Sequence, residues 1–579
     1  MKRLVFILIV FNLSFLYAQV AVKENALDFP QEKIFIHYNS SFLVSGERLY
    51  YKIYCLDAKT NHLSNFSKIA YLELIGVNNQ FVFKHKIRLK SGIGDGDFFM
   101  PTSVPSGNYK LIAYTQWMRN NSDNTFFKGD ITVINPFLRA KEMNVNPLES
   151  KKDSLVIPIA TYYYKPVRSQ KNTIVNLELN KESFSNREKV TLTLKSLVGK
   201  ESSGNYSISV RKRDTIRVAK RTTSLEFMKS NMNINTVLGV LPTYIPELRG
   251  ELVSGKVILE SNGKPAKNIK VAFSISGKNY FLKIANTNNL GVFYFNLDKA
   301  YENSNAIVQV VDPEREKYRI EMNKHKSPEY DKLTFYDFKT SSKLKNLIIE
   351  KSISNQIENA YHSVKKDSVL PVKEISPFYG SVIKNYGLDD YTRFSSLEET
   401  IIEVVDEAFV KKKKGKYTLH VKLSDRVIRS NLSPLVLMDG IFLQDHDVLF
   451  NYNIKKIKSI SVIREKYIYG SLIFEGIISI QTFDGDYQSN SSGEFIKNIE
   501  MFKPQVFKKR FNQSYKDLKL VRIPDYRNQL LWEPNIHLER DKTSISFFTS
   551  DVKGEYEICI EGFNKKGKPI FLNKIFVVR

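Results

Sequence analysis

Cysteine and tryptophan are scarce in this chain, with two of each among 579 residues. Cys55 and Cys559 stand near opposite ends of the sequence, so the chain lacks the dense cysteine pattern of small secreted domains. Cys55 alternates with Tyr51 and Ile53, which predicts a buried position on a β-strand. We expect both cysteines to be unpaired thiols.

Motifs that carry catalytic chemistry are missing as well. The chain has no Gly-x-Ser-x-Gly elbow, no P-loop and no dinucleotide-binding glycine pattern. None of the eight histidines precedes a glutamate by three residues, and the His-Glu-x-x-His zinc motif is absent. We therefore predict no enzyme and no catalytic, metal-binding or cofactor-binding residues. One alternative stays open, a hydrolase of unrecognised type built on Asp445, His446 and Asp447, where a turn and a loop are predicted.

Long apolar runs are missing except at the start of the chain. Residues 1–18 contain two basic residues, a following apolar run and the small Ala18, which predicts a signal peptide. The run is shorter than the roughly 18 residues of a membrane-spanning helix. No cysteine follows Ala18, so we expect no lipid anchor there. We predict export to the periplasm, outer membrane or cell surface, with a mature chain that begins near Gln19 and has no transmembrane segment.

Acidic residues are outnumbered, since 87 Lys and Arg against 61 Asp and Glu give a formal charge of +26. Removal of residues 1–18, which carry two basic and no acidic residues, leaves 26 − 2 = +24. Such a charge suits an anionic partner, but nucleic acid is not expected outside the cytoplasm. For the basic run Lys411–Lys414 two interpretations stay open, namely contact with an anionic membrane surface and an ordinary charged loop.

The sequence is rich in β-strand patterns, and its length predicts about four or five domains. Between residues 29 and 137, aromatic and β-branched runs alternate with turn pairs such as Ser45-Gly46, which predicts a β-sandwich. Within this range we expect a glycine-rich loop, with turn glycines and with two carboxylates in solvent rather than in a calcium site. Those residues are Gly92, Gly94, Gly96, Asp95 and Asp97.

The segment 29–137 resembles the macroglobulin domain of α2-macroglobulin-like proteins, and 171–218 is predicted to be a second domain of this kind. The resemblance is carried by Ser45-Gly46-Glu47, Phe98, Pro101, Gly107 and Tyr109. The reactive Cys-x-Glu-Gln string of that family is absent, so the resemblance implies a fold and no protease trap. The string SGKVILESNGKPAKNIKVAFSI within 250–313 resembles the transthyretin-like regulatory domain found beside carboxypeptidases.

The stretch 434–482 contains the most specific sequence pattern in the chain. The pair Asp439-Gly440 between two apolar runs predicts a two-residue type I′ hairpin. The order PLVLMDG, IKKIKSISVIRE and YGSLIFEGIISIQT resembles the plug domain of TonB-dependent outer-membrane receptors, which implies a small mixed α+β domain over 394–487. Only 579 − 487 = 92 residues follow Tyr487, too few for the barrel of such a receptor. We expect any barrel to belong to a separate protein.

Helical patterns occur only around this stretch. We expect two helices, each burying an apolar face, and docking of a partner on these faces is the alternative. The first lies in a connector over 326–393 and the second follows two candidate capping boxes at Ser395 and Ser396. The apolar positions are Ile349, Ile353, Ile357, Ala360 and Tyr361 in the first, and Leu397, Ile401, Val404 and Ala408 in the second.

The end of the chain is predicted to contain a linker over 488–499 and a C-terminal β domain over 520–579. The strings Pro524-Asp525-Tyr526-Arg527 and Trp532-x-Pro534, placed after the plug-like stretch, resemble a family of exported Bacteroidota proteins in which macroglobulin-like domains surround a plug-like domain. The fold class is therefore predicted to be mainly β and multidomain, with several β-sandwiches of macroglobulin and transthyretin type and one small mixed α+β domain.

The predicted function is that of a non-enzymatic accessory or scaffold protein at the outer membrane. It would act by protein–protein contact with a separate barrel or with a transport or secretion complex. Tyr467, Tyr469 and Gly470 are predicted to face that partner, whereas Asp439 and Gly440 form a structural turn. A ligand-binding or adhesion module of the cell envelope is the alternative, beside the hydrolase.

Overall fold

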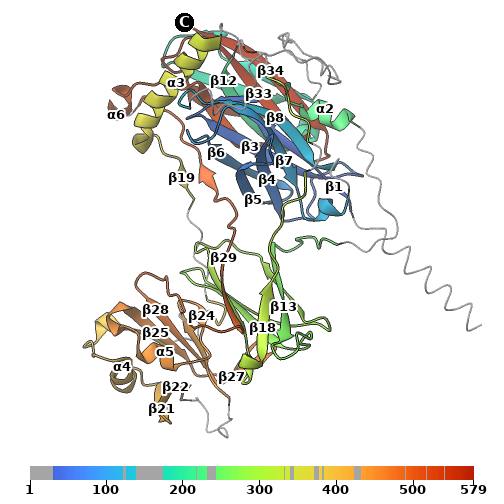
Figure 1. Cartoon of the computed structure of the whole chain (residues 1–579). Helices are drawn as coiled ribbons and strands as arrows, with labels where there is room; N and C mark the ends of the chain where they lie inside the picture. Colours follow the sequence, from blue (N-terminus) through green and yellow to red (C-terminus); the bar gives the residue numbers. More distant parts are fainter. Residues whose placement is uncertain are drawn as a thin grey trace, which may run out of the picture. The chain divides into compact units, whose positions relative to one another are not determined.

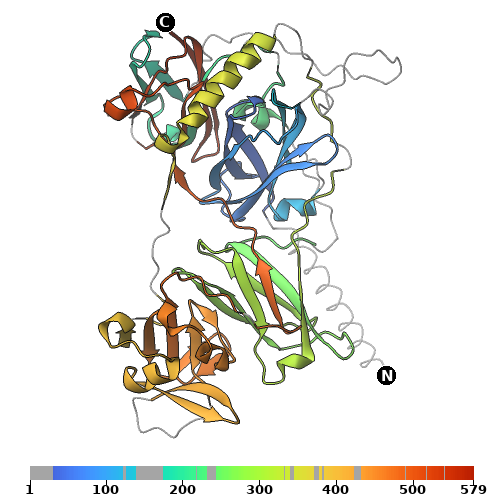
Figure 2. The ribbon, with the colours of Figure 1, turned by 60° about the vertical axis from the view of Figure 1, so that its left-hand side comes forward.

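The computed structural model of the chain describes residues 30–121, 125–138, 174–214, 216, 218–230, 243–330, 333–338, 344–370, 377–380, 384–422, 432–489, 491–516, 518–539 and 541–579. They belong to two compact units. Unit 1 takes its residues from 1–248, 328–370 and 504–579, and unit 2 from 249–327 and 371–503. Most elements in both units are strands, so the mainly β, multidomain prediction is confirmed (Figures 1 and 2). The predicted signal peptide, 1–18, lies outside the described residues.

The N-terminal sandwich of unit 1 packs a sheet of order β1-β3-β6 on one of order β2-β8-β7-β4-β5. Its core is aromatic and includes Phe35, Tyr54 and Tyr114, all fully buried. Cys55 on β3 is buried, as predicted. The strands are β1 Glu32–Tyr38, β2 Phe42–Val44, β3 Arg48–Asp57, β4 Ile69–Gly76, β5 Phe81–Arg88, β6 Ile93–Phe99, β7 Gly107–Tyr114 and β8 Phe127–Ile134.

The expected glycine-rich loop of this sandwich is largely the strand β6. Gly92 is a turn glycine, with φ +75°, but Gly94 and Gly96 lie inside the strand. A Cβ on Gly96 would stand 2.3 Å from the Tyr51 hydroxyl, so the glycine makes room for a core tyrosine. Asp97 was predicted to lie in solvent, but its side chain is buried and the residue is only 6% exposed. The local pattern does not reveal this burial, because the residues that contact Asp97 include Lys508 and Arg510, far away in the sequence.

A second sandwich of unit 1, the split sandwich, joins two segments that were predicted to form separate domains. The order β10-β34-β33-β12-β31 interleaves strands from 171–218 with strands from 520–579, and β32 pairs with β11 in the facing sheet β32-β11-β9. Neither segment has enough strands to cover its own apolar face. The strands are β9 Val175–Leu179, β10 Ser183–Phe184, β11 Lys189–Ser196, β12 Gly204–Lys212, β31 Gln529–Leu538, β32 Lys542–Phe548, β33 Gly554–Asn564 and β34 Pro569–Val578.

The central sandwich of unit 2 contains sheets of order β16-β13-β18 and β15-β14-β17-β29. It extends the predicted domain 250–313 at its C-terminal side. Its last strand, β29, comes from the segment predicted as a linker, and it pairs with β17 from Asn305↔Glu500 to Gln309↔Ile496. The strands are β13 Glu251–Leu259, β14 Lys270–Ile275, β15 Phe281–Asn286, β16 Val292–Leu297, β17 Asn305–Val310, β18 Tyr318–Met322 and β29 Ile496–Glu500.

The mixed-sheet domain of unit 2 has the strand order β20-β25-β28-β23-β24. β23 runs parallel to β28 and the other neighbours are antiparallel, which agrees with the predicted small mixed sheet. Two separate hairpins, β21–β22 and β26–β27, extend from it. The strands are β20 Lys384–Gly387, β21 Ala408–Lys413, β22 Lys416–Val421, β23 Leu435–Met438, β24 Ile441–Phe442, β25 Ile457–Ile463, β26 Tyr467–Tyr469, β27 Leu472–Phe474 and β28 Ile477–Thr482.

The helix predicted after Ser395 and Ser396 is α4, Leu397–Glu403, with Ser396 as its N-cap. It ends before Ala408, which begins β21. The other helices are short except α3, and no described helix is long and apolar enough to cross a membrane. The other α-helices are α2 Ser224–Lys229, α3 Lys345–Ala360, α5 Asp447–Phe450 and α6 Leu518–Val521. The 3-10 helices are η1 Trp117–Asn120, η4 Gly199–Ser202, η5 Arg315–Lys317, η7 His362–Val364, η8 Leu388–Asp390 and η9 Ile454–Lys456. Two short strands of unit 1, β19 Ser368–Val369 and β30 Lys508–Lys509, pair with each other.

The helix α3 does not bury the apolar face that its sequence pattern predicted. Ile349 and Ile353 are 44% and 51% exposed, whereas Lys351, Ser352 and Asn355 are buried. The buried face meets the turn before β3, whose carbonyl oxygens need donors. The predicted apolar stripe is therefore on the outer face of the helix.

Candidate interaction site

The hairpin turn between β23 and β24 has the left-handed backbone of a type I′ turn. Asp439 has φ +49° and Gly440 has φ +85°. The Asp439 carboxylate is buried and accepts hydrogen bonds from the Thr482 amide (2.8 Å), the Thr482 hydroxyl (2.6 Å) and the Tyr487 amide (3.0 Å). The turn residue thus also fixes the chain that leaves the last strand of the mixed sheet.

Gly440 lies against the ring of Tyr280, which comes from the central sandwich. A Cβ on Gly440 would stand 2.1 Å from Cγ of Tyr280, closer than any side chain can pack. On the other side of the turn, the Gly277 amide donates to the Asp439 carbonyl oxygen at 3.1 Å. The Asp-Gly pair therefore forms part of the interface between the two domains of unit 2, which the sequence did not indicate.

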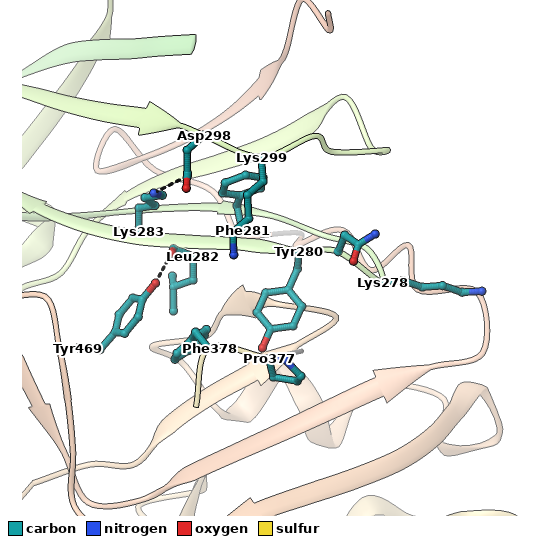
Figure 3. A pocket seen from close by; sticks show the side chains of 11 residues that line it. Lys278, Tyr280, Phe281, Leu282, Lys283, Asp298, Lys299, Pro377, Phe378 and Tyr469 are labelled. Carbon is teal, nitrogen blue, oxygen red and sulfur yellow. Dashed lines mark hydrogen bonds and ion pairs between the residues drawn. The ribbon is translucent and has the colours of Figure 1, made fainter. Parts of the chain in front are cut away.

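The predicted partner-facing tyrosines lie on the inner face of the β26–β27 hairpin. The Tyr467 hydroxyl donates to the Phe378 carbonyl oxygen at 2.9 Å. The Tyr469 hydroxyl donates to the Leu282 carbonyl oxygen (Figure 3). Tyr469 also packs on Phe378 with ring centroids 4.3 Å apart, and burial raises its pKa to about 12. Both hydroxyls are thus used inside unit 2, and the role of Tyr467, Tyr469 and Gly470 toward a partner stays a prediction.

A small cavity of about 140 Å³ lies beside these rings. Figure 3 shows the Tyr280 ring turned toward Pro377 and Phe378, and the Lys283 ammonium 2.9 Å from the Asp298 carboxylate. Lys278 points away from the aromatic side chains. The cavity is narrow, and Lys283 with Asp298 and Tyr469 with the Leu282 carbonyl oxygen are already paired in its wall, so we assign no ligand to it.

The outer face of the same hairpin presents two apolar side chains. Ile468 and Ile473 are cross-strand partners and are 71% and 51% exposed. Their neighbours in the strands, Tyr467, Tyr469 and Phe474, pack on the opposite face of the hairpin against Phe378 and side chains of the central sandwich. The strand alternation of YIYGSLIF indicates this division, because successive side chains point to opposite faces. The same alternation places the predicted contact residues Tyr467 and Tyr469 on the inner face.

A larger cavity, about 350 Å³, opens between the central sandwich and the mixed-sheet domain. The Gln309 side chain donates to the Phe442 carbonyl oxygen at 2.7 Å, and the Gln444 side chain donates to Gln309 Oε1 at 2.7 Å. Arg315 lies over the Phe495 ring, 5.2 Å from its centroid, and Asp445 lines the other part of the wall. The volume falls in the range of small-molecule sites.

The residues of the hydrolase alternative hold a hairpin in place. Nδ1 of His446 accepts the Leu419 amide at 3.1 Å, and Oδ1 of Asp447 accepts the Tyr417 amide at 2.9 Å. Asp445 accepts the Asp447 amide. Burial lowers the pKa of His446 to about 4, so the ring is a neutral acceptor at pH 7. These bonds fix β22 to α5, so the three side chains have structural roles in this hairpin.

Three buried groups in unit 1, His37, Cys559 and Glu561, place their ligand atoms within 4.8 Å of one another. The Arg221 guanidinium contacts the Glu561 carboxylate and lies 3.1 Å from the Cys559 sulfur. Burial lowers the pKa of His37 well below its usual value. A divalent cation here would share a buried site with a permanent positive charge, so the cluster does not fit a metal centre. Arg221 already supplies the cation.

No family profile and no curated protein sequence matches this chain. Among solved structures, the chain is similar to Salmonella α2-macroglobulin reacted with methylamine, with a TM-score of 0.24, 9% identity, and coverage of 94% of this chain and 39% of that chain. It is also similar to dimeric latent PorU from Porphyromonas gingivalis (TM-score 0.15, 13% identity, 51% and 34% coverage) and to the Escherichia coli adhesin FdeC (0.15, 9%, 51% and 62%). The chain spans about two fifths of the length of that α2-macroglobulin. At these scores the similarities assign no function.

Proposed function

We propose that this protein is an exported, non-enzymatic scaffold of the cell envelope that uses its mixed-sheet domain to bind an outer-membrane protein. The resemblance of 394–487 to receptor plug domains suggests the class of partner. The observation that carries the proposal is the exposed Ile468–Ile473 pair, because it stands on a hairpin whose other face is fixed by Tyr467 and Tyr469. Rigid, exposed apolar side chains are typical contact residues.

The proposal predicts that the outer face of this hairpin contributes to partner recovery. The unmodified protein would be crosslinked in membranes of its native host and purified with its partners. Changing Ile468 and Ile473 together to serine should reduce recovery of the outer-membrane partner at least about tenfold, which corresponds to about 1.4 kcal/mol, with the melting temperature unchanged. Leu290→Ser with Ile402→Ser is the matched control, since these apolar side chains of unit 2 are 67% and 64% exposed.

Equal recovery from the hairpin variant and the control would contradict the proposal. Tyr469→Phe gives a further comparison, because it removes the bond to the Leu282 carbonyl oxygen and should act on the stability of unit 2. If Tyr469→Phe lowers recovery of the partner without any change in melting temperature, the face of the hairpin that carries Tyr467 and Tyr469 is the contact surface.

The 350 Å³ cavity supports a second candidate, a module that binds a small molecule. Arg315 and Asp445 offer charges of opposite sign on a wall with several apolar groups. A thermal-shift screen with envelope-derived sugars and peptides tests it, using Arg315→Gln as the variant and Arg319→Gln, on the neighbouring strand, as the control. If a compound raises the melting temperature of Arg315→Gln as much as that of the unmodified protein, it does not bind in this cavity.

A further inference from the structure

The basic run that the sequence left open between a loop and a membrane contact forms the end of the β21–β22 hairpin. The register runs from Ala408↔Val421 to Lys413↔Lys416, and Lys414 and Gly415 make the turn, with φ +50° and +80°. All residues from Lys411 to Lys416 are exposed. In both views the hairpin extends from the edge of the mixed-sheet domain (Figures 1 and 2).

The base of this hairpin is firmly held. Leu419 and Val421 belong to the core of the mixed-sheet domain, and the amides of Tyr417 and Leu419 donate to Asp447 and His446. Tyr417 stacks on Phe450, with ring centroids 4.3 Å apart. The lysines are therefore presented by a fixed ribbon.

Five ammonium groups gather at this end, those of Lys411, Lys412, Lys413, Lys414 and Lys416. Lys413 and Lys416 are direct cross-strand partners, an arrangement of like charges that destabilises a ladder. Within the described residues, none of the five ammonium groups forms an ion pair. Lys412 instead donates to the Tyr417 hydroxyl at 2.6 Å and lies 4.3 Å from its ring centroid.

Nearby carboxylates do not neutralise the tip. The carboxylates of Glu398 and Asp447 interact electrostatically with Lys412, and Asp406 and Glu407 at the base pair with Lys384, at 3.7 and 2.9 Å. Six residues of β-strand carry the turn about 20 Å from the base. That distance is about two Debye lengths at physiological ionic strength, so the tip acts as a separate positive charge.

We infer that this hairpin, through Lys411–Lys414 and Lys416, binds the phosphate-bearing headgroups of an anionic lipid surface. Lysine ammonium groups are compact point charges without the planar fork that arginine uses for bidentate recognition. They line neither of the cavities described above and lie on an exposed hairpin end, so a continuous anionic surface fits them better than a single small anion. Membrane attraction of this kind adds approximately over the lysines near the surface.

Vesicle binding by the full mature chain tests this inference, and it needs no partner protein, so its outcome is independent of the capture experiment above. Binding would be measured to vesicles of phosphatidylcholine with and without phosphatidylglycerol. The variant changes all five lysines to glutamine. The control changes five exposed lysines elsewhere to glutamine and so has the same net charge; they are Lys59, Lys90, Lys189, Lys267 and Lys324.

Each lysine at an anionic surface contributes about fivefold, so the hairpin variant should bind the phosphatidylglycerol vesicles at least about a hundredfold more weakly than the control. Binding should weaken steeply with salt. Equal binding by variant and control would overturn the inference. So would equal binding of the unmodified chain to duplex DNA, or competition by inorganic phosphate at the same phosphate concentration, because the hairpin would then take polyanions or free phosphate.

Discussion

Gly440 shows how one residue serves a turn and a domain interface together. Its positive φ suits a residue without a Cβ, and the Tyr280 ring occupies the space that a Cβ would take. Gly415, in the turn of the β21–β22 hairpin, has nearly the same φ, +80°, but nothing within 4 Å of its Cβ position. Comparing alanine substitutions at the two glycines therefore distinguishes the cost of a positive φ from the cost of a clash with Tyr280.

Gly440→Ala should therefore destabilise unit 2 far more than Gly415→Ala. Backbone strain alone costs about 1 kcal/mol, and overpacking at the Tyr280 ring adds about 1–3 kcal/mol. Hydrogen exchange at the Gly277 amide, which donates to the Asp439 carbonyl oxygen, measures the effect locally. Adding Tyr280→Ala to Gly440→Ala should recover part of the loss. Equal effects of the two glycine variants would refute the clash.

His446 makes the mixed-sheet domain sensitive to acid. Burial, with a smaller contribution from His420, lowers its pKa from 6.5 to about 4 in the folded chain. Between these values the unfolded chain binds more protons, so this stability is fully present above about pH 6.5 and is lost as the pH falls toward 4. The difference corresponds to about 3 kcal/mol.

We expect exchange of the Leu419 amide, corrected for its intrinsic pH dependence, to accelerate over that range. His446→Gln should lose this pH dependence, because an amide oxygen can accept the Leu419 bond but does not titrate. A His446 NMR titration with a midpoint near 6.5 would contradict the assignment.

At the scale of elements, α3 reverses the usual relation between apolar pattern and burial. The Lys351 ammonium lies 2.9 Å from Asp214 and 3.7 Å from Glu47, and Asn355 and Asn359 donate to the Ser45 and Gly46 carbonyl oxygens. Burial disfavours ionised Glu47, but Arg211 and Lys351 outweigh it and lower its pKa. These polar contacts with the turn beneath it place the helix, together with the packing of Leu347 and Ile348 against the buried cluster that contains Phe42 and Val44.

Substituting both Ile349 and Ile353 with glutamine should therefore change stability by no more than about 0.5 kcal/mol, as is usual for exposed sites. Lys351→Ala should cost about 3 kcal/mol, because it removes the ammonium group from Asp214 and leaves Glu47 with Arg211 alone. Chemical unfolding of the full chain, followed at the transition of unit 1, measures both. A large loss in the isoleucine variant would mean that the stripe is covered.

At the scale of the whole molecule, unit 1 is assembled from segments far apart in the chain. Asp97 on β6 accepts from Arg48 at 2.7 Å and from Lys508 at 2.9 Å, and Arg510 contacts both Asp97 and Asp367. Burial disfavours ionised Asp97, but Arg510 and Lys508 outweigh it and lower its pKa to about 2. Asp97 binds residues 508 and 510 directly, and Arg510 links it to Asp367, so this cluster connects three distant segments of the chain.

Asp97→Asn should release the segment around β30 and cost about 3 kcal/mol, since Arg48, Lys508 and Arg510 then face one another without the carboxylate that they share. The readout is exchange at the Phe511 amide, which donates to Asp367 at 2.8 Å. Asp95→Asn is the control, because Asp95 lies 3.6 Å from Arg510 and forms a weaker contact. Equal protection in both variants would show that other contacts hold the segment.

The sequence by itself determined the features that depend on neighbours along the chain. Alternation and turn residues predicted most strands, the Asp439-Gly440 hairpin and a helix start at Ser395 or Ser396, because these follow from local backbone geometry and capping. Tertiary structure decided how the segments combine. The split sandwich, the buried Asp97, the outward stripe of α3 and the anchoring role of His446 all depend on contacts between residues far apart in sequence, and a pattern of apolar and polar positions does not specify those partners.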